Sequence, residues 1–268
     1  MRKHKKSVLS LLLLCAVTLV MTIAALRASV PPPPPTAQEQ NDDDQMPVTA
    51  YGKPEPSDPE KRKIRRVRAA RHNLKDKNID ASRFAITEGT QSGYGTFEVH
   101  AKPEPALPAA QSDLIVVAEV TDAEAFLSAD KTSIYSEFTL SVGEVLGGAS
   151  AGAVLPGASI TAERGGGAVR FPSGRIVRRA FMGKPFPRTG RRYVFFLKRN
   201  QEGESFSILT AYELRGGRVF PLDGLDLRGR TVPQLAAHQR YAQMDEAAFL
   251  TAVREAIAQT SVAPGGGE

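Results

Sequence analysis

The chain has 268 residues, 41% of them hydrophobic, and a formal net charge of +6. Its one cysteine, Cys15, excludes a disulfide framework within the chain and a cysteine-based metal cluster. The four histidines are scattered without the paired spacing of a metal site, so we expect neither a metal nor a cofactor. The positive charge directs attention to anionic partners.

A basic N-terminus precedes an apolar run from Val8 to Leu26. This order indicates an export signal or a membrane anchor. Nineteen residues in a helix extend about 28 Å, close to the ~30 Å of a bilayer's hydrocarbon core. The sequence therefore predicts, within residues 1–30, a single-pass anchor in the cell membrane that leaves the C-terminal domain outside the cytoplasm. A cleaved signal, giving a secreted or periplasmic protein, is the alternative.

Residues 31–111 are predicted to form a disordered stalk. The stalk begins with five prolines, and its next part is acidic, with seven carboxylates against Lys53 alone between residues 36 and 60. Such composition buries too little apolar surface to offset the entropy of ordering. Sparse apolar residues between 79 and 111, among them Phe84, Ile86 and Tyr94, predict at most one edge strand.

The charge of the stalk reverses from Lys61 to Lys77, where nine cations oppose only Asp76. One interpretation is a solvated linker, and another is a contact with an anionic envelope polymer or lipid. No aromatic residues interleave the cations to stack on bases, which disfavours nucleic acid as a partner.

Short apolar segments between glycine and proline turns predict a β domain over residues 112–224. Its expected strands are residues 113–120, 134–146, 159–163, 168–171, 175–181, 191–198, 206–215 and 218–222. Gly216 and Gly217 predict a two-residue hairpin with Leu214 opposite Val219. The alternation slips at Gly143, which predicts a bulge there. Antiparallel strands at this spacing favour a small barrel or sandwich.

Residues 225–260 change to a helical period, and residues 261–268 form a glycine-rich tail. A first helix is predicted from Pro233 towards Tyr241. Asp245 is the expected cap of a second helix. Its apolar face, which we expect to pack on the β domain, consists of Phe249, Val253, Ala256 and Ile257.

The sequence contains only weak matches to motifs of catalytic sites. Residues 148–152 match the Gly-x-Ser-x-Gly pattern around Ser150, with Asp223 or Asp226 and then His238 in the order of a serine hydrolase. That pattern requires a helix directly after the serine, and Pro156 forbids one of useful length. We therefore expect no enzyme activity and keep a hydrolase using Ser150 only as a remote alternative.

The central hairpins are strongly basic. Side chains that alternate on strands share a face, so a groove for an anionic ligand is predicted from Arg164, Arg170, Arg175, Arg178, Arg191 and Arg192. The competing interpretation is a solvated face whose charges prevent edge-to-edge aggregation.

Four segments carry a resemblance: residues 112–120, 131–138, 167–174 and 216–224. They resemble a group of bacterial envelope proteins, a group that implies no particular activity. More distantly, the order of a long second strand, a basic hairpin and the strand Tyr193-Val194-Phe195-Phe196-Leu197 looks like the netrin-like, OB-type barrels. These include metalloproteinase inhibitors, but the N-terminal cysteine with which the inhibitors contact the metal has no counterpart here.

The expected fold class is thus mainly β, a small antiparallel OB-like or netrin-like barrel with a C-terminal helical cap. The expected function is that of a membrane-tethered extracytoplasmic module with a binding or structural role in the cell envelope. Its expected partners are the membrane, through Val8 to Leu26, and an envelope protein or anionic polymer. Polyanion binding through Lys61 to Lys77 and the basic hairpins is the alternative function.

Overall fold

The computed structural model describes residues 46–74, 80–95, 103–202, 204–226 and 229–262, all within one compact unit, Asn41–Glu268. Strands make up 38% of the described residues, which confirms a mainly β fold. The predicted anchor from Val8 to Leu26 lies outside the described residues. Among the residues described, no helix has the length and apolar character needed to cross a membrane.

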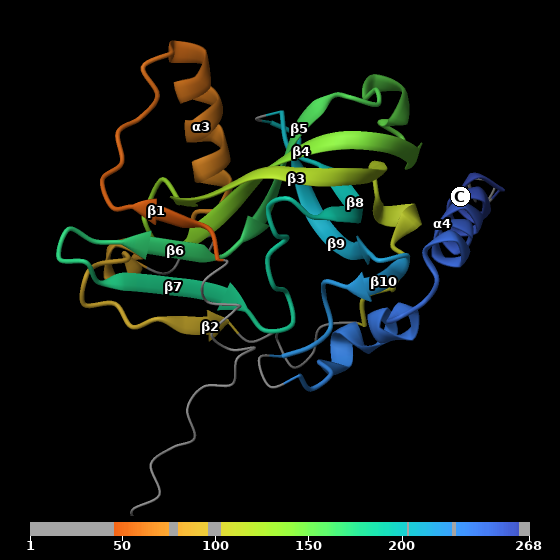
Figure 1. Ribbon diagram of the computed structural model, residues 1–268. Coiled ribbons are helices and arrows are strands. Elements are labelled where there is room, and N and C mark those ends of the chain that lie inside the picture. Colours follow the sequence, from red (N-terminus) through yellow and green to blue (C-terminus); the bar gives the residue numbers. More distant parts are fainter. Residues whose placement is uncertain (1–45, 75–79, 96–102, 203, 227–228, 263–268) are drawn as a thin grey trace, which may run out of the picture. The chain divides into compact units, whose positions relative to one another are not determined.

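Five strands pair into a sheet that closes on itself (Figure 1). They are β3 (Leu114–Leu127), β4 (Ile134–Gly147), β5 (Ser159–Gly165), β8 (Arg192–Arg199) and β9 (Phe206–Arg215). β3 pairs with β4 and β8, β4 with β5, and β8 with β9, all antiparallel. A short parallel pairing of β5 with β9 completes the ring. β10 (Arg218–Pro221) extends β9 at the edge.

Apolar residues fill the inside of the closed sheet. Because side chains alternate along a strand, every second residue of β3 points inwards, as do the aromatic residues Phe138 of β4 and Tyr193 and Phe195 of β8. The inner core includes Leu114, Val116, Ala118, Val120, Phe138, Leu140, Val142, Ala162, Tyr193, Phe195 and Leu197.

A second apolar core lies on the outer face of β3, β8, β9 and β10, under the helix α4 (Glu246–Val262). Phe249 and Val253 of α4 are fully buried there against Val194 and Phe196 of β8. Tyr212 donates a hydrogen bond to the Ala106 carbonyl, and burial raises the pKa of its phenol. The predicted packing of the C-terminal helix on the β domain is confirmed.

A smaller four-stranded sheet has the order β1-β6-β7-β2. It contains β1 (Val48–Ala50), β6 (Gly167–Arg170), β7 (Ile176–Phe181) and β2 (Gly93–Gly95). Among the described residues, 3-10 helices connect the elements: η1 (Ala81–Phe84), η2 (Ala109–Gln111), η3 (Ala151–Ala153) and η4 (Pro233–Tyr241). Gly167 joins the two sheets in a left-handed conformation (φ 137°), where a β-carbon would approach Ser136 to 2.8 Å.

Local signals of the sequence are confirmed. Gly216 and Gly217 have positive φ angles, and Leu214 faces Val219. The register of β3 on β4 slips at Gly143, as expected for a bulge. Asp245 accepts hydrogen bonds from the N–H groups of residues 247 and 248 at the start of α4.

Two expectations need correction. The predicted helix from Pro233 to Tyr241 is a 3-10 helix, in which the buried residues Leu235, His238 and Tyr241 follow one another every three positions. More important, the predicted disordered stalk over residues 31–111 contains β1, the α-helix α3 (Pro59–Arg71), η1 and η2. The prediction of disorder from composition was wrong here because these segments are stabilised by partners far along the chain, not by an apolar core of their own. β2, at the edge of the smaller sheet, agrees with the edge strand predicted between residues 79 and 111.

Candidate functional site

The helix α3 contains most of the basic block that the sequence singled out. Pro59 occupies its first turn, and the Asp58 side chain accepts hydrogen bonds from the N–H groups of Glu60 (2.9 Å) and Lys61 (3.4 Å). A proline start and an aspartate cap are strong local signals for a helix N-terminus. The last turn carries Arg68 and Arg71, which favour the negative end of the helix dipole.

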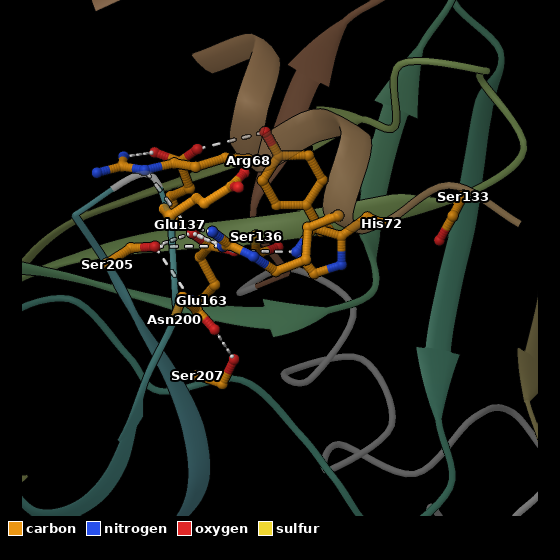
Figure 2. Close-up of polar contacts among 12 residues, drawn as sticks. Arg68, His72, Ser133, Ser136, Glu137, Glu163, Asn200, Ser205 and Ser207 are labelled. Carbon is orange, nitrogen blue, oxygen red and sulfur yellow. Dashed lines mark hydrogen bonds and ion pairs between the residues drawn. The ribbon is translucent and has the colours of Figure 1, made fainter. Parts of the chain in front are cut away.

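Glu163, on the outer face of β5, fixes the C-terminal end of α3. Its side chain is only 1% exposed. Arg71 Nη1 donates to both carboxylate oxygens, at 2.9 and 2.7 Å, and His72 Nε2 lies 3.0 Å from one of them. The Ser205 hydroxyl also donates to this carboxylate (Figure 2). We call this group of Glu163, Arg71, His72 and Ser205 the Glu163 cluster.

Glu137, on the neighbouring strand β4, provides a second anchor. Arg68 Nη1 donates to Glu137 at 2.8 Å, and Arg65 Nε lies 3.9 Å away. Next to this carboxylate, the His72 ring stacks on Tyr135 with centroids 4.2 Å apart and planes 9° apart. The helix therefore docks on β4 and β5 through ions and rings, whereas α4 docks on its strands through apolar side chains.

Hydrogen bonds and nearby cations keep the Glu163 carboxyl ionised. Burial raises the pKa of the Glu163 carboxyl, but hydrogen bonds from His72, Ser205 and Arg71 together outweigh burial and hold that pKa below its usual value. Burial is also the main cause of the raised pKa of the neighbouring Tyr135 phenol. At neutral pH the site is therefore a carboxylate satisfied by cationic donors.

The cluster includes the residue types of a hydrolytic triad but not its geometry. A nucleophilic serine must donate its proton to an imidazole. Here the Ser205 hydroxyl donates to Glu163 and accepts from Arg71 (3.3 Å) and Asn200 (3.1 Å). Asn200 in turn accepts from Ser207 at 2.8 Å, so this network holds the β8–β9 turn against α3 (Figure 2).

A groove of about 740 Å³ opens between α3 and the β8–β9 turn, beside the Glu163 cluster. It is lined by Arg66, Val67, Ala70, Arg71, Lys198, Arg199, Asn200, Gln201, Glu202 and Ser207. Four cations thus face a single carboxylate. Arg66 and Arg71 are paired with Glu55 and Glu163, but the described residues offer Lys198 and Arg199 no carboxylate within ion-pair distance. We call this feature the cationic groove.

The arginines predicted to form an anion groove are not brought together. Arg164 is buried, and its guanidinium donates to Asp223 at 2.7 and 3.1 Å. This prediction was wrong for Arg164, because its neighbour Glu163 faces outwards and Arg164 therefore faces the protein interior.

Of the other five, Arg170 lies on β6, Arg178 on β7 and Arg192 on β8, whereas Arg175 and Arg191 each stand directly before a strand. Arg170 is exposed, and Arg178 is hydrogen-bonded through its N–H to Ser92. Arg175 reaches the Thr90 carbonyl at 3.4 Å. At the start of β8, Arg191 lies 4.0 Å from Glu213, and Arg192 pairs with Glu246. The side chains of Arg175, Arg191 and Arg192 are thus held by groups of the protein itself.

The Ser150 pattern also lacks its structural context. Ser150 precedes η3, a single 3-10 turn, and Val154 is already extended. His238 is buried, stacks on Tyr212 and bonds the Leu235 carbonyl through Nδ1. Over the part of the chain that the structure describes, no three His, Cys, Asp or Glu side chains gather in a way suited to a metal ion.

Sequence reasoning missed Glu163, His72 and the β8–β9 turn. The charge pattern offered one signal. A carboxylate that faces outwards on a strand is a candidate partner for a basic block that lacks counter-charges in its own part of the sequence. Comparison of the chain with protein-family models, curated proteins and solved structures finds no match. The resemblance to envelope proteins and netrin-like barrels therefore rests on the sequence segments alone.

Proposed function

We propose that this protein is a membrane-tethered, extracytoplasmic binding module whose ligand is an anion held in the cationic groove. The observation that carries the proposal is the groove itself: about 740 Å³, with four cations and one carboxylate in its lining. Lys198 and Arg199 lie on its β8 side without a carboxylate partner among the described residues. Cations that no carboxylate neutralises are available to a ligand, and a cleft lined mainly by one sign of charge attracts ligands of the opposite sign.

The position of the groove supports the same conclusion. We interpret the closed five-stranded sheet as an OB-type barrel, in which β4 and β5 are the second and third strands and the β8–β9 turn joins the fourth to the fifth. OB-folds bind oligonucleotides and oligosaccharides over the second and third strands and the loop between the fourth and fifth. Here α3 lies over those strands, and the groove lies between α3 and that loop.

A direct test compares the substitutions Lys198→Gln and Arg199→Gln with Arg170→Gln as a matched control. Arg170 is an exposed arginine of the smaller sheet. We expect the full chain, in non-ionic detergent, to bind inorganic polyphosphate in a salt-dependent way. Each groove substitution removes about 1 kcal/mol of attraction and weakens binding about fivefold, whereas the control stays within twofold. An equal loss in all three variants would mean that net charge alone acts, and would sink the proposal.

The tether is supported by the apolar run from Val8 to Leu26 and its basic flank. Protease accessibility of a C-terminal tag in intact cells, spheroplasts and lysed cells tests it, with membrane fractionation alongside. A tag that is cut before lysis while the protein stays with membranes supports the proposed location. A tag protected until lysis would overturn it, and would leave ligands of the cytoplasm to be examined.

A further inference from the structure

A second hollow lies on the other flank of α3. Its volume is about 580 Å³. It is lined by the segment from β1 to Glu55, by α3, and by the turn between β3 and β4. Again four cations, Lys53, Arg65, Arg66 and Lys131, face one carboxylate, Glu55. The basic helix is thus flanked by two positively charged depressions.

The cations of the second hollow differ in availability. Lys53 pairs with Glu124, and Arg65 lies 3.7 Å from the centroid of the Phe126 ring. Lys131 has no carboxylate within ion-pair distance among the residues described. Its backbone is fixed in a left-handed conformation (φ 59°), and its N–H donates to the Ser128 carbonyl at 2.9 Å. Lys131, which lies over the Tyr51 ring, is therefore the cation of this hollow that is positioned and that no carboxylate neutralises.

The two hollows share a boundary. Arg66 and Ala70 line both of them, and these residues are one helical turn apart on the exposed side of α3. The exposed Glu55–Arg66 pair lowers the pKa of Glu55 through the Arg66 hydrogen bond. Because the Ala70 side chain is only a methyl group, no bulky side chain separates the two hollows beside Arg66. A row of cations therefore leads from Lys198, past the Glu55-paired Arg66, to Lys131.

We infer that the ligand of the cationic groove is an unbranched anionic polymer without bases, which crosses α3 and occupies both hollows. This inference rests on the proposed function. A helix with its side chains is about 10–12 Å wide, so a small anion occupies one hollow and only a chain reaches the other. Cations that lie at intervals across the surface are complementary to the negative charges that repeat along an anionic polymer.

The aromatic residues of the second hollow argue against nucleic acid. Base recognition on single strands needs an exposed ring face for stacking. Tyr51 stacks on Phe171 with centroids 4.6 Å apart, and Lys131 lies over its ring. Phe126 is buried, and Arg65 covers its ring. Because both rings are already covered, the row of cations offers charge without a stacking surface.

The test measures how chain length and single substitutions combine. Fluorescence-detected binding of the full chain is compared for tripolyphosphate and for a long inorganic polyphosphate, in wild type, Lys198→Gln, Lys131→Gln and the control Arg170→Gln. We expect Lys198→Gln to weaken both ligands about fivefold, and Lys131→Gln to weaken only the long chain to that extent. Arg66→Gln, a second and highly exposed change, should weaken the long chain at least as much as Lys131→Gln.

The outcomes distinguish failure of the crossing over α3 from failure of the proposed groove. If Lys131→Gln and Arg66→Gln leave long-chain binding within twofold while Lys198→Gln lowers it, the crossing is refuted and the groove survives as a small-anion site. If Lys198→Gln changes neither ligand, or neither ligand binds, the proposed function fails, and the inference fails with it. Single-stranded DNA that binds more tightly than polyphosphate of equal charge would refute the choice of a polymer without bases.

Discussion

Replacement of Glu163 by glutamine tests the idea that a buried carboxylate holds the basic helix. Glutamine keeps the size of the side chain but removes its charge. Breaking one side of a buried ion pair costs about 3–5 kcal/mol. Because the Arg71 side chain is 22% exposed, water compensates part of the loss, and we expect about 2 kcal/mol.

Trypsin provides the assay, because α3 carries seven lysines and arginines that are protected only while the helix is docked. When opening is fast relative to cleavage, the cleavage rate follows the population of the open form. A loss of about 2 kcal/mol then raises the rate of cleavage within α3 about 30-fold. The matched control is Glu144→Gln, since Glu144 pairs with Arg254 at 2.9 Å in an exposed bridge, 49% and 52% exposed. We expect the control to change the rate less than threefold.

Acidification should reproduce the effect of the substitution. The pKa of Glu163 is lowered in the folded protein from a value of 4.5. A carboxyl with a depressed folded-state pKa stabilises fully above its unfolded pKa, and that stabilisation is lost as the pH falls through the folded value. The difference in urea midpoint between wild type and Glu163→Gln should therefore shrink below about pH 4.5. A difference that stays constant to pH 3, or a cleavage rate unchanged by Glu163→Gln, would refute the anchor.

Three further predictions concern the scaffold. Gly167→Ala should lower the free energy of unfolding by at least about 2 kcal/mol more than Gly174→Ala, because only Gly167 has close neighbours around its missing β-carbon; equal effects in thermal denaturation would contradict this. Arg164→Met should cost about 3–5 kcal/mol by leaving Asp223 buried without a counter-charge, and adding Asp223→Leu should restore more than half of the loss, which a double-mutant cycle measures. Asp245→Ala should cost about 1 kcal/mol by removing the cap of α4, and an unchanged urea midpoint would argue that packing alone fixes the helix.

Short-range patterns allowed much of the β domain to be predicted. Alternation placed β9 at its observed bounds, and the glycine pair at 216 and 217 gave the hairpin and its register. These features depend on residues within a few positions of one another, where steric rules act directly. The closure of the sheet depends instead on the β5–β9 pairing, which joins residues more than forty positions apart.

The candidate site was harder to predict, and Glu163 and Arg164 show why. They are adjacent in the sequence, and both are buried and charged. On a strand, neighbours face opposite sides, so Glu163 meets Arg71 of α3 while Arg164 meets Asp223 near the C-terminal end of the domain. From the charge pattern of the sequence alone, Glu163 and Arg164 would both be placed on a solvated surface. Only the tertiary structure supplies a different counter-ion on each side.

The same physics explains why α3 is a helix at all. Seven cations in thirteen residues repel one another when they are three or four positions apart, and the block has too few apolar residues to bury. Carboxylates relieve the repulsion on both sides: Glu137 and Glu163 pair with cations that face the sheet, and Glu55 pairs with Arg62 and Arg66 on the outer side. The acidic strands thus make the basic segment ordered and leave it cationic. A helix fixed in this way presents its remaining charges at defined positions, which a disordered basic linker of the same composition does not.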